Sequence, residues 1–248
     1  AFAHGVRNVI MANQLVGKGN MAIIAGLLRE DNAFDFACIV DSADNADALG
    51  HYFASQQLKL RVMFEYGIAG GRTGIRPEQH DADVLAAVKR WPQALALVGV
   101  ELYEGVSNDE AVIRRFLRHV MSRTEALAQA GEFAEPQVIL TGAGSAWFDV
   151  VAEELTRKET HLDAEKHYVL DIILRSGCYV THDVGAYQAA VERMQSSNPV
   201  GRDMNSSLQP ALQVWAAVQS LPEPGRAIIA FGKRDAGYDC LLYTSPSP

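Results

Sequence analysis

Residues suited to anion binding recur in loops that each follow a short apolar segment. The first loop follows residues 61–64 and holds Glu65, Gly70, Gly71 and Arg72. Glycine lets the backbone come close to a ligand, and a planar guanidinium grips an anionic oxygen through two donors. Glycines in a loop also simply form turns, so this loop alone leaves both interpretations open. Three further loops of similar character favour the anion-binding interpretation.

Each of the other loops also follows an apolar segment. They hold Glu101, Tyr103 and Glu104; then Thr141, Gly142, Gly144 and Ser145; and finally Arg175, Ser176, Gly177, Cys178 and Tyr179. The third loop leads directly into a predicted helix, whose free N–H groups and positive dipole end favour a phosphate. Gly177 and Cys178 offer backbone donors after Arg175, which makes a second cradle of the same type. Either loop alone fits a helix cap or a tight turn; together they favour one shared phosphate site.

The segments that position these loops predict a parallel α/β fold. Strands are predicted at residues 9–12, 37–40, 61–64, 95–100, 138–140 and 168–174, because β-branched residues without polar alternation suit strands buried on both faces. Helices are predicted between them, at residues 21–29, 44–56, 77–90, 108–130 and 146–157. A doubly wound sheet and a (β/α)8 TIM barrel both fit this alternation. The barrel is favoured, because polar loops follow several different strands instead of meeting at one switch point.

The pattern changes after residue 183. A loop is predicted at 198–203, a helix at 208–221 and a further strand at 226–231, which together indicate the start of a truncated β domain. We therefore predict a barrel domain at 1–185 and a connection plus the start of the β domain at 186–239. Residues 240–248 continue no earlier pattern and resemble translated adapter sequence, so a non-native tail is expected there. The chain opens at Ala1 without methionine, and we expect a fragment whose barrel is incomplete.

Composition narrows the class of protein. The chain has 248 residues, 48% of them hydrophobic, and a net charge of -8, which argues against a nucleic-acid surface. No apolar run approaches the roughly 20 residues of a membrane span. The three cysteines, Cys38, Cys178 and Cys240, form no CxxC pair, which favours a reducing compartment. A cytoplasmic protein without nucleic-acid or membrane partners is expected.

Three segments together resemble one family. Residues 64–74, 141–145 and 174–183 are similar to the D-threonine aldolase and D-serine dehydratase-like group, which includes enzymes called amino acid deaminases. This group belongs to the alanine-racemase-fold (fold type III) pyridoxal-phosphate enzymes, and the resemblance runs from about residue 6 to 239. It implies a pyridoxal 5'-phosphate barrel of the alanine racemase N-terminal type, followed by a D-serine dehydratase-like β domain. The implied activity is that of a lyase acting on D-amino or 3-hydroxyamino acids.

The resemblance assigns cofactor-binding roles to seven residues. Arg72 would approach the phenolic oxygen of the cofactor, and Tyr103 would lie beside its ring. Arg175 falls where alanine racemases place an arginine against the pyridine nitrogen. The phosphate would be held by Gly144, Ser145, Gly177 and Cys178. Cys178 has no histidine partner placed by sequence, so a backbone role is favoured over that of a nucleophile.

Other parts of the family's machinery are expected outside the chain. The resemblance places the Schiff-base lysine upstream of Ala1, so no catalytic residue is predicted here, and Lys18 is expected to be a solvated loop residue. The family's zinc or manganese ligands would lie beyond Asp239, so no metal ligand is predicted in this chain. His182 and Asp183 are adjacent on an extended segment and point to opposite faces, which makes them poor co-ligands.

Several functional alternatives stay open. The segment 175–179 looks more like the deaminase branch, which favours deamination or dehydration, but aldolase-type C–C cleavage is the alternative. A non-catalytic pyridoxal-phosphate-binding protein is a third interpretation. The chain by itself is predicted to be inactive, since an open barrel exposes sheet edges and apolar surface. The expected partners are a small amino acid substrate and, by resemblance, a second copy in a homodimer.

Overall fold

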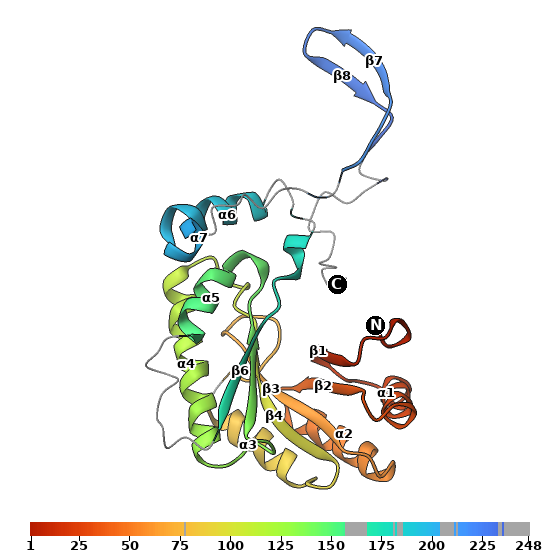
Figure 1. Cartoon of the computed structure of the whole chain (residues 1–248), viewed down its shortest axis with the longest axis vertical. Helices are drawn as coiled ribbons and strands as arrows, with labels where there is room; N and C mark the ends of the chain where they lie inside the picture. Colours follow the sequence, from red (N-terminus) through yellow and green to blue (C-terminus); the bar gives the residue numbers. More distant parts are fainter. Residues whose placement is uncertain are drawn as a thin grey trace. The chain divides into compact units, whose positions relative to one another are not determined.

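A computed structural model describes residues 1–76, 78–156, 168–180, 182, 186–203, 211, 213–232 and 235. The chain divides into two compact units, Ala1–Arg175 and Ser176–Pro248 (Figure 1). Each unit is described by itself below. The predicted tail at 240–248 lies outside the described residues. The predicted domain boundary after residue 185 stays a prediction.

The first unit is a curled sheet of six parallel strands in the sequential order β1-β2-β3-β4-β5-β6. A doubly wound sheet reverses its strand order at a switch point, whereas a barrel adds each strand beside the previous one. The predicted α/β fold and incomplete (β/α)8 barrel are therefore confirmed. The strands are β1 (Asn8–Gln14), β2 (Asp35–Val40), β3 (Leu60–Tyr66), β4 (Leu95–Leu102), β5 (Gln137–Gly142) and β6 (Val169–Leu174).

Helices lie between successive strands and pack on the outer face of the sheet (Figure 1). Ser42 caps α2 by accepting a hydrogen bond from the Asn45 amide at 3.3 Å. The long α4 buries an apolar stripe that includes Ile113, Phe116 and Val120. The helices are η1 (Phe2–His4), α1 (Lys18–Glu30), α2 (Ala43–Ser55), α3 (Glu78–Lys89), α4 (Glu110–Gln129), η2 (Ser145–Trp147) and α5 (Phe148–Leu155).

The inner face of the sheet is apolar in its middle and polar at both ends. Ile39, Met63, Val98 and Ile139 form a small core of their own there. Residues such as Asp35, Arg61 and Asp171 lie toward the amino ends of the strands, and Glu65, Glu101 and Thr141 lie side by side near the carboxyl ends. A cavity of about 510 Å³ lies on this face, lined by residues of β1, β2, β3, β5 and β6 and by Arg175. Layered packing of this kind is typical of barrel interiors.

The second unit contains η4 (Gly177–Val180), α6 (Ala186–Ser197), α7 (Pro199–Asp203) and an antiparallel hairpin of β7 (Val218–Glu223) and β8 (Arg226–Ile229). The strand predicted at 226–231 is confirmed. The loop predicted at 198–203 is wrong, because a short helix begins at Pro199, where proline is well tolerated. The helix predicted at 208–221 is also wrong over its described part, where residues 218–221 pair with β8 across a turn at Gly225. Pairing with a neighbouring strand overrides helical spacing here.

Candidate functional site

The carboxyl ends of β3, β4, β5 and β6 bring the predicted loops to one edge of the sheet. Glu65 pairs with Glu101 in register, and Glu101 pairs with Thr141. Arg175 follows β6, and its amide donates to the Gly142 carbonyl at 3.0 Å. Active sites of barrels are built at this edge. Three of the predicted loops and Arg175, which are distant in sequence, therefore lie at the edge where barrels build their sites.

The first loop is fastened to the sheet through Glu65. Gln14 Nε2 donates to Glu65 Oε2 at 2.8 Å, and the Thr73 hydroxyl donates to Glu65 Oε1. The Ile75 amide donates to the Glu65 carbonyl at 2.7 Å, and the Gly74 amide to Asp41 Oδ2 at 3.0 Å. Burial raises the pKa of Glu65, opposed by the hydrogen bond from Thr73. The loop is thus a fixed scaffold and not a loose turn.

The two arginines of this loop differ in role. Arg76 points into the loop, where its guanidinium donates to the carbonyls of Gly71, Thr73 and Gly74. Arg72 is exposed, and its Nη2 donates to Asn13 Oδ1 at 2.9 Å. Arg76 therefore shapes the loop, and Arg72 presents its charge outward. Arg72 also lines a small pocket together with Tyr103, Glu65 and Val106. The structure thus brings two of the predicted cofactor-binding residues together.

Arg175 is held by three partners at the same edge. It forms an ion pair with Glu101, its Nε donates to Thr141 Oγ1 at 3.2 Å, and its Nη2 donates to the Leu102 carbonyl at 3.0 Å. Burial raises the pKa of Glu101 to about 8, although Arg175 opposes the rise. Glu101 Oε2 is buried and has no hydrogen-bond partner among the described residues. A guanidinium fixed in this way is preorganised toward a ligand at the barrel mouth.

The loop after β5 packs directly on the loop after β4. A Cβ added at Gly144 would lie 2.8 Å from Tyr103 Cε2 and 3.3 Å from Glu104 Oε1. Glycine is therefore required at position 144 for the close approach of Tyr103 and Glu104, whatever the loop binds. Ser145 opens η2, which leads into α5, and the side chain of Ser145 lies outside the described set. The predicted succession of a glycine loop and a helix start is present.

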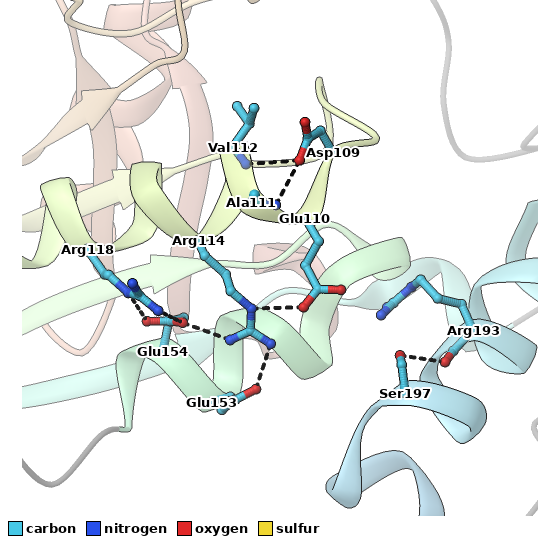
Figure 2. A network of polar contacts seen from close by, with 10 residues as sticks. All are labelled: Asp109, Glu110, Ala111, Val112, Arg114, Arg118, Glu153, Glu154, Arg193 and Ser197. Atoms are coloured by element: carbon cyan, nitrogen blue, oxygen red, sulfur yellow. Dashed lines mark hydrogen bonds and ion pairs between the residues drawn. The ribbon is translucent and has the colours of Figure 1, made fainter.

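Ion pairs clamp α5, the helix that this loop enters, to α4 (Figure 2). Arg114 contacts Glu110, Glu153 and Glu154 at 2.8, 2.9 and 2.7 Å, and Arg118 contacts Glu154 at 2.9 Å. The Glu154 side chain is buried, so these contacts are screened less than surface pairs. Asp109 caps α4 by accepting from the amides of Ala111 and Val112 (Figure 2). The clamp holds the last turn of α5 against α4.

Gly177 and Cys178 belong to the second unit, where they open η4. The His182 amide donates to the Cys178 carbonyl at 3.1 Å, which tightens this turn. Cys178 is half-buried. Their predicted part in a phosphate site shared with Gly144 and Ser145 stays a prediction.

Lys18 and Cys38 have no predicted role in the site. Lys18 is exposed and is the first residue of α1, not a loop residue. Cys38 lies buried within β2, and burial raises the pKa of its thiol to about 12, so the thiol stays protonated. Among the described ranges, no group of three or more His, Cys, Asp or Glu side chains is placed to hold a metal ion. The predicted zinc or manganese therefore gains no support here.

Sequence reasoning missed a buried triad beneath the first loop. The Tyr66 hydroxyl donates to Asp81, and Arg123 Nε donates to the same carboxylate at 3.0 Å. These contacts tie the end of β3 to α3 and α4, close to where the Arg72 loop begins. The residues are far apart in sequence, and no spacing signal connects them. A buried tyrosine usually has a hydrogen-bond partner, and this rule is the one signal that points to a polar residue beside Tyr66.

Comparisons with known proteins agree with this fold. No protein-family model matches the sequence, and no curated protein matches it. Among solved structures, D-threonine aldolase from Filomicrobium marinum is similar over 94% of this chain and 56% of its own, with 22% identity and a TM-score of 0.67. D-threo-3-hydroxyaspartate dehydratase from Delftia sp. HT23 matches 74% of this chain and 45% of its own, with 21% identity and a TM-score of 0.53.

Alanine racemase from Bacillus anthracis is a third similar structure, with 13% identity, a TM-score of 0.51, and coverage of 84% of this chain and 45% of its own. The chain spans about half the length of these three structures. At such identities the likeness shows the fold. The resemblance predicted from the loop motifs is confirmed at that level, because the same groups of proteins share this barrel.

Proposed function

We propose that this chain forms the cofactor-binding barrel of a pyridoxal-phosphate-dependent lyase acting on D-amino or 3-hydroxyamino acids. The convergence of Arg72, Tyr103, Arg175 and the Gly142–Ser145 loop at the carboxyl edge of adjacent strands carries the proposal. The edge offers two guanidinium groups and a glycine loop at a helix start, which are donors suited to a phosphorylated, anionic ring. The barrel fold of D-threonine aldolase and D-threo-3-hydroxyaspartate dehydratase supports it.

The residues present fit such a cofactor in kind. Gly144 lies against the Tyr103 ring, where an added Cβ would come within 2.8 Å of Cε2, so glycine at this position lets the loop and Tyr103 meet at the edge where the cofactor would bind. In this proposal Arg72 approaches the phenolic oxygen and Tyr103 lies beside the ring. Arg175 faces the ring nitrogen. Gly144 and Ser145, with Gly177 and Cys178, hold the phosphate.

Bound pyridoxal phosphate withdraws electrons from a bond at the α-carbon of an amino acid substrate. The part of this chain is to bind and orient that ring. Arg175 is held by Glu101, Thr141 and the Leu102 carbonyl, so it would offer the ring nitrogen a hydrogen-bonding group in a fixed orientation. Arg72 keeps an exposed charge for the phenolic oxygen. The lysine that would join the cofactor covalently is proposed to precede Ala1 in the complete protein.

Deamination is the proposed outcome, because the residues Arg175 to Tyr179 resemble the deaminase branch. Aldolase-type cleavage is a second candidate, favoured by the likeness to D-threonine aldolase over 94% of this chain. A non-catalytic pyridoxal-phosphate-binding protein is the candidate from another class. We also propose a cytoplasmic homodimer and, in the complete protein, a divalent metal. No helix among the described residues is long and apolar enough to cross a membrane.

The test is product analysis with the complete protein that contains this chain. Incubation with pyridoxal phosphate and a 3-hydroxy D-amino acid should release ammonia and a keto acid. Glycine and an aldehyde without ammonia would favour the aldolase reaction instead. No turnover despite tight cofactor binding would favour the non-catalytic protein. The purified 248-residue chain serves as the comparison and is expected to be inactive; turnover by it would contradict that expectation.

A further inference from the structure

Glu104 is the most unusual charge at the carboxyl edge. The residue has 0% of its surface exposed, and neither carboxyl oxygen has a hydrogen-bond partner among the described residues. Burying an ionised carboxylate without partners is costly, and such a group tends to take up a proton instead. A residue of this kind calls for an explanation at a site where the fold places function.

Glu104 lies against the predicted phosphate loop. Its Oε1 is 3.3 Å from the position of a Cβ at Gly144, on the side of the loop that Tyr103 also covers. Besides the amide of Glu104 itself, the backbone amides of Gly144 and Ala143 lie near enough to lower its pKa, although none of them forms a hydrogen bond of normal geometry. The same two peptide groups belong to the loop that would receive a phosphate. One set of amide dipoles therefore faces a carboxyl group of the protein itself.

The surroundings of Glu104 decide its charge. Burial raises the pKa of Glu104 to about 7, and the amides and Arg175 oppose the rise. Glu101 on β4 carries a second buried carboxyl, and its pKa is raised partly by Glu104 and by Glu65 on β3. Arg72, in the loop after β3, lowers the pKa values of both Glu65 and Glu101. A further anion on the loop would add to this negative charge in a site of low dielectric constant.

We propose that Glu104 controls anion binding at the Gly142–Ser145 loop: a phosphate monoester binds there when the Glu104 carboxyl is neutral, and ionisation of Glu104 weakens that binding. The inference rests on the proposed function, because it places the cofactor phosphate at this loop. Glu104 acts as a positioning residue. When neutral it leaves the amide dipoles of Ala143 and Gly144 to the ligand, and when ionised it competes with the ligand for them.

The test uses the complete protein and pyridoxine 5'-phosphate, which has no aldehyde and so needs no lysine to bind. Pyridoxine without phosphate is measured in parallel, and the ratio of the two Kd values isolates the contribution of the phosphate. A phosphate monoester has its second pKa near about 6, so its charge changes little between pH 6.5 and pH 8.5. In the wild type this phosphate advantage should shrink about tenfold across that range.

In Glu104→Gln the advantage should stay constant within about twofold, because the amide cannot ionise. The matched control is Glu30→Gln, which removes the same charge from the exposed end of α1 and should keep the tenfold change. The same pH dependence in wild type and Glu104→Gln would overturn the inference while leaving the proposed function intact. A phosphate advantage absent at every pH would overturn both, since the loop would then hold no phosphate.

If Glu104→Gln does not fold, proton uptake by the wild type decides. Calorimetry at pH 7.5 in two buffers of different ionisation enthalpy measures the protons taken up when pyridoxine 5'-phosphate binds. About half a proton more should be taken up than with pyridoxine, because Glu104 must become neutral. Equal uptake with the two ligands would overturn the inference.

Discussion

The two ends of the barrel's inner face both carry charged residues, but they treat those charges differently. At the amino end Arg61 pairs with Asp35 and Glu135, whose side chains are 46% and 43% exposed. At the carboxyl end Glu101 and Glu104 are almost completely buried. Glu101 forms an ion pair with Arg175. Glu101 Oε2 and both carboxyl oxygens of Glu104 have no hydrogen-bond partner in the described part of the chain.

The comparison indicates that the charges at the amino end support the fold, whereas those at the carboxyl end are arranged for chemistry. At the amino end Arg61 is only 24% exposed, but both of its carboxylate partners reach solvent, so these pairs change the free energy of folding little. Buried carboxyl groups with spare lone pairs and raised pKa values are typical of sites arranged for chemistry. Barrels place function at the carboxyl end and stability at the amino end, and this sheet follows that division in its charges.

Removing the arginine at each end should give the largest contrast. At pH 8.5, where Glu101 is largely ionised, Arg175→Met leaves this carboxylate buried without its counter-charge and should lower the free energy of unfolding by about 3 kcal/mol. Arg61→Met exposes two carboxylates that water already reaches and should cost less than about 1 kcal/mol. Urea unfolding of the two variants measures both values. Equal losses would remove the distinction between the ends.

Raising the pH should destabilise the protein through the carboxyl end. Burial raises the folded-state pKa of Glu101 and Glu104 from 4.5 to about 8 and about 7, so the folded state binds more protons than the unfolded one in this range. Their stabilising contribution is complete below about pH 4.5 and is lost as the pH rises toward 8. One pKa unit corresponds to about 1.4 kcal/mol, so the loss between pH 5 and pH 8 should amount to several kcal/mol.

A double variant, Glu101→Gln with Glu104→Gln, should flatten this slope in urea unfolding measured at several pH values. Asp31 and Asp47 have lowered pKa values because of hydrogen bonds, chiefly from the Ala33 amide and from Arg90 respectively, so their contribution changes only at acid pH, outside this window. An unchanged slope in the double variant would mean that other groups set the pH dependence.

A substitution at Gly144, beside Tyr103, should have a smaller effect on stability. Gly144→Ala places a Cβ 2.8 Å from the Tyr103 ring and should cost about 1.5 kcal/mol, because the ring must move. Gly26→Ala is the matched control: nothing lies within 4 Å of its added Cβ, and alanine in the middle of α1 should stabilise by about 0.5 kcal/mol. Thermal unfolding of the two variants measures both effects. Equal shifts in Tm would show that the loop accommodates the added Cβ without strain.

Arg72→Met should have the smallest effect on folding and a large one on binding. The guanidinium is exposed and donates one hydrogen bond, to Asn13, so the free energy of unfolding should change by less than about 0.5 kcal/mol. Affinity for pyridoxal phosphate should fall about tenfold in the complete protein, measured by fluorescence titration. Unchanged affinity would exclude Arg72 from the site.

The fold was predictable because the strands are continuous apolar runs separated by capped helices. The Ser42 cap of α2 and the helical spacing of apolar residues in α4 are local signals that the sequence shows directly. The barrel, with its sequential order β1 to β6, was expected because polar loops follow several different strands. The site was predictable only as a set of loops. Which arginine of the first loop faces outward depends on carbonyls that Arg76 contacts, and no pattern in sequence reveals those contacts.

The importance of Glu104 was equally hidden in the sequence. A glutamate after a strand is most simply a solvated loop residue, and only the packing of Tyr103 and Gly144 around it makes it buried. At the hairpin of β7 and β8 the sequence pattern predicted the wrong secondary structure. Helical spacing at 208–221 predicted a helix, but residues 218–221 pair with a strand that follows them in sequence. Local periodicity does not reveal such a partner.

The most direct test of the central claim is the absorbance spectrum of the complete protein with added pyridoxal phosphate, recorded before and after borohydride treatment. A band near the visible is expected, and after borohydride the cofactor should stay attached to a lysine preceding Ala1 when the protein is denatured. A protein that remains colourless with added cofactor would contradict it, because the anion-binding loops at the carboxyl edge would then hold some other ligand.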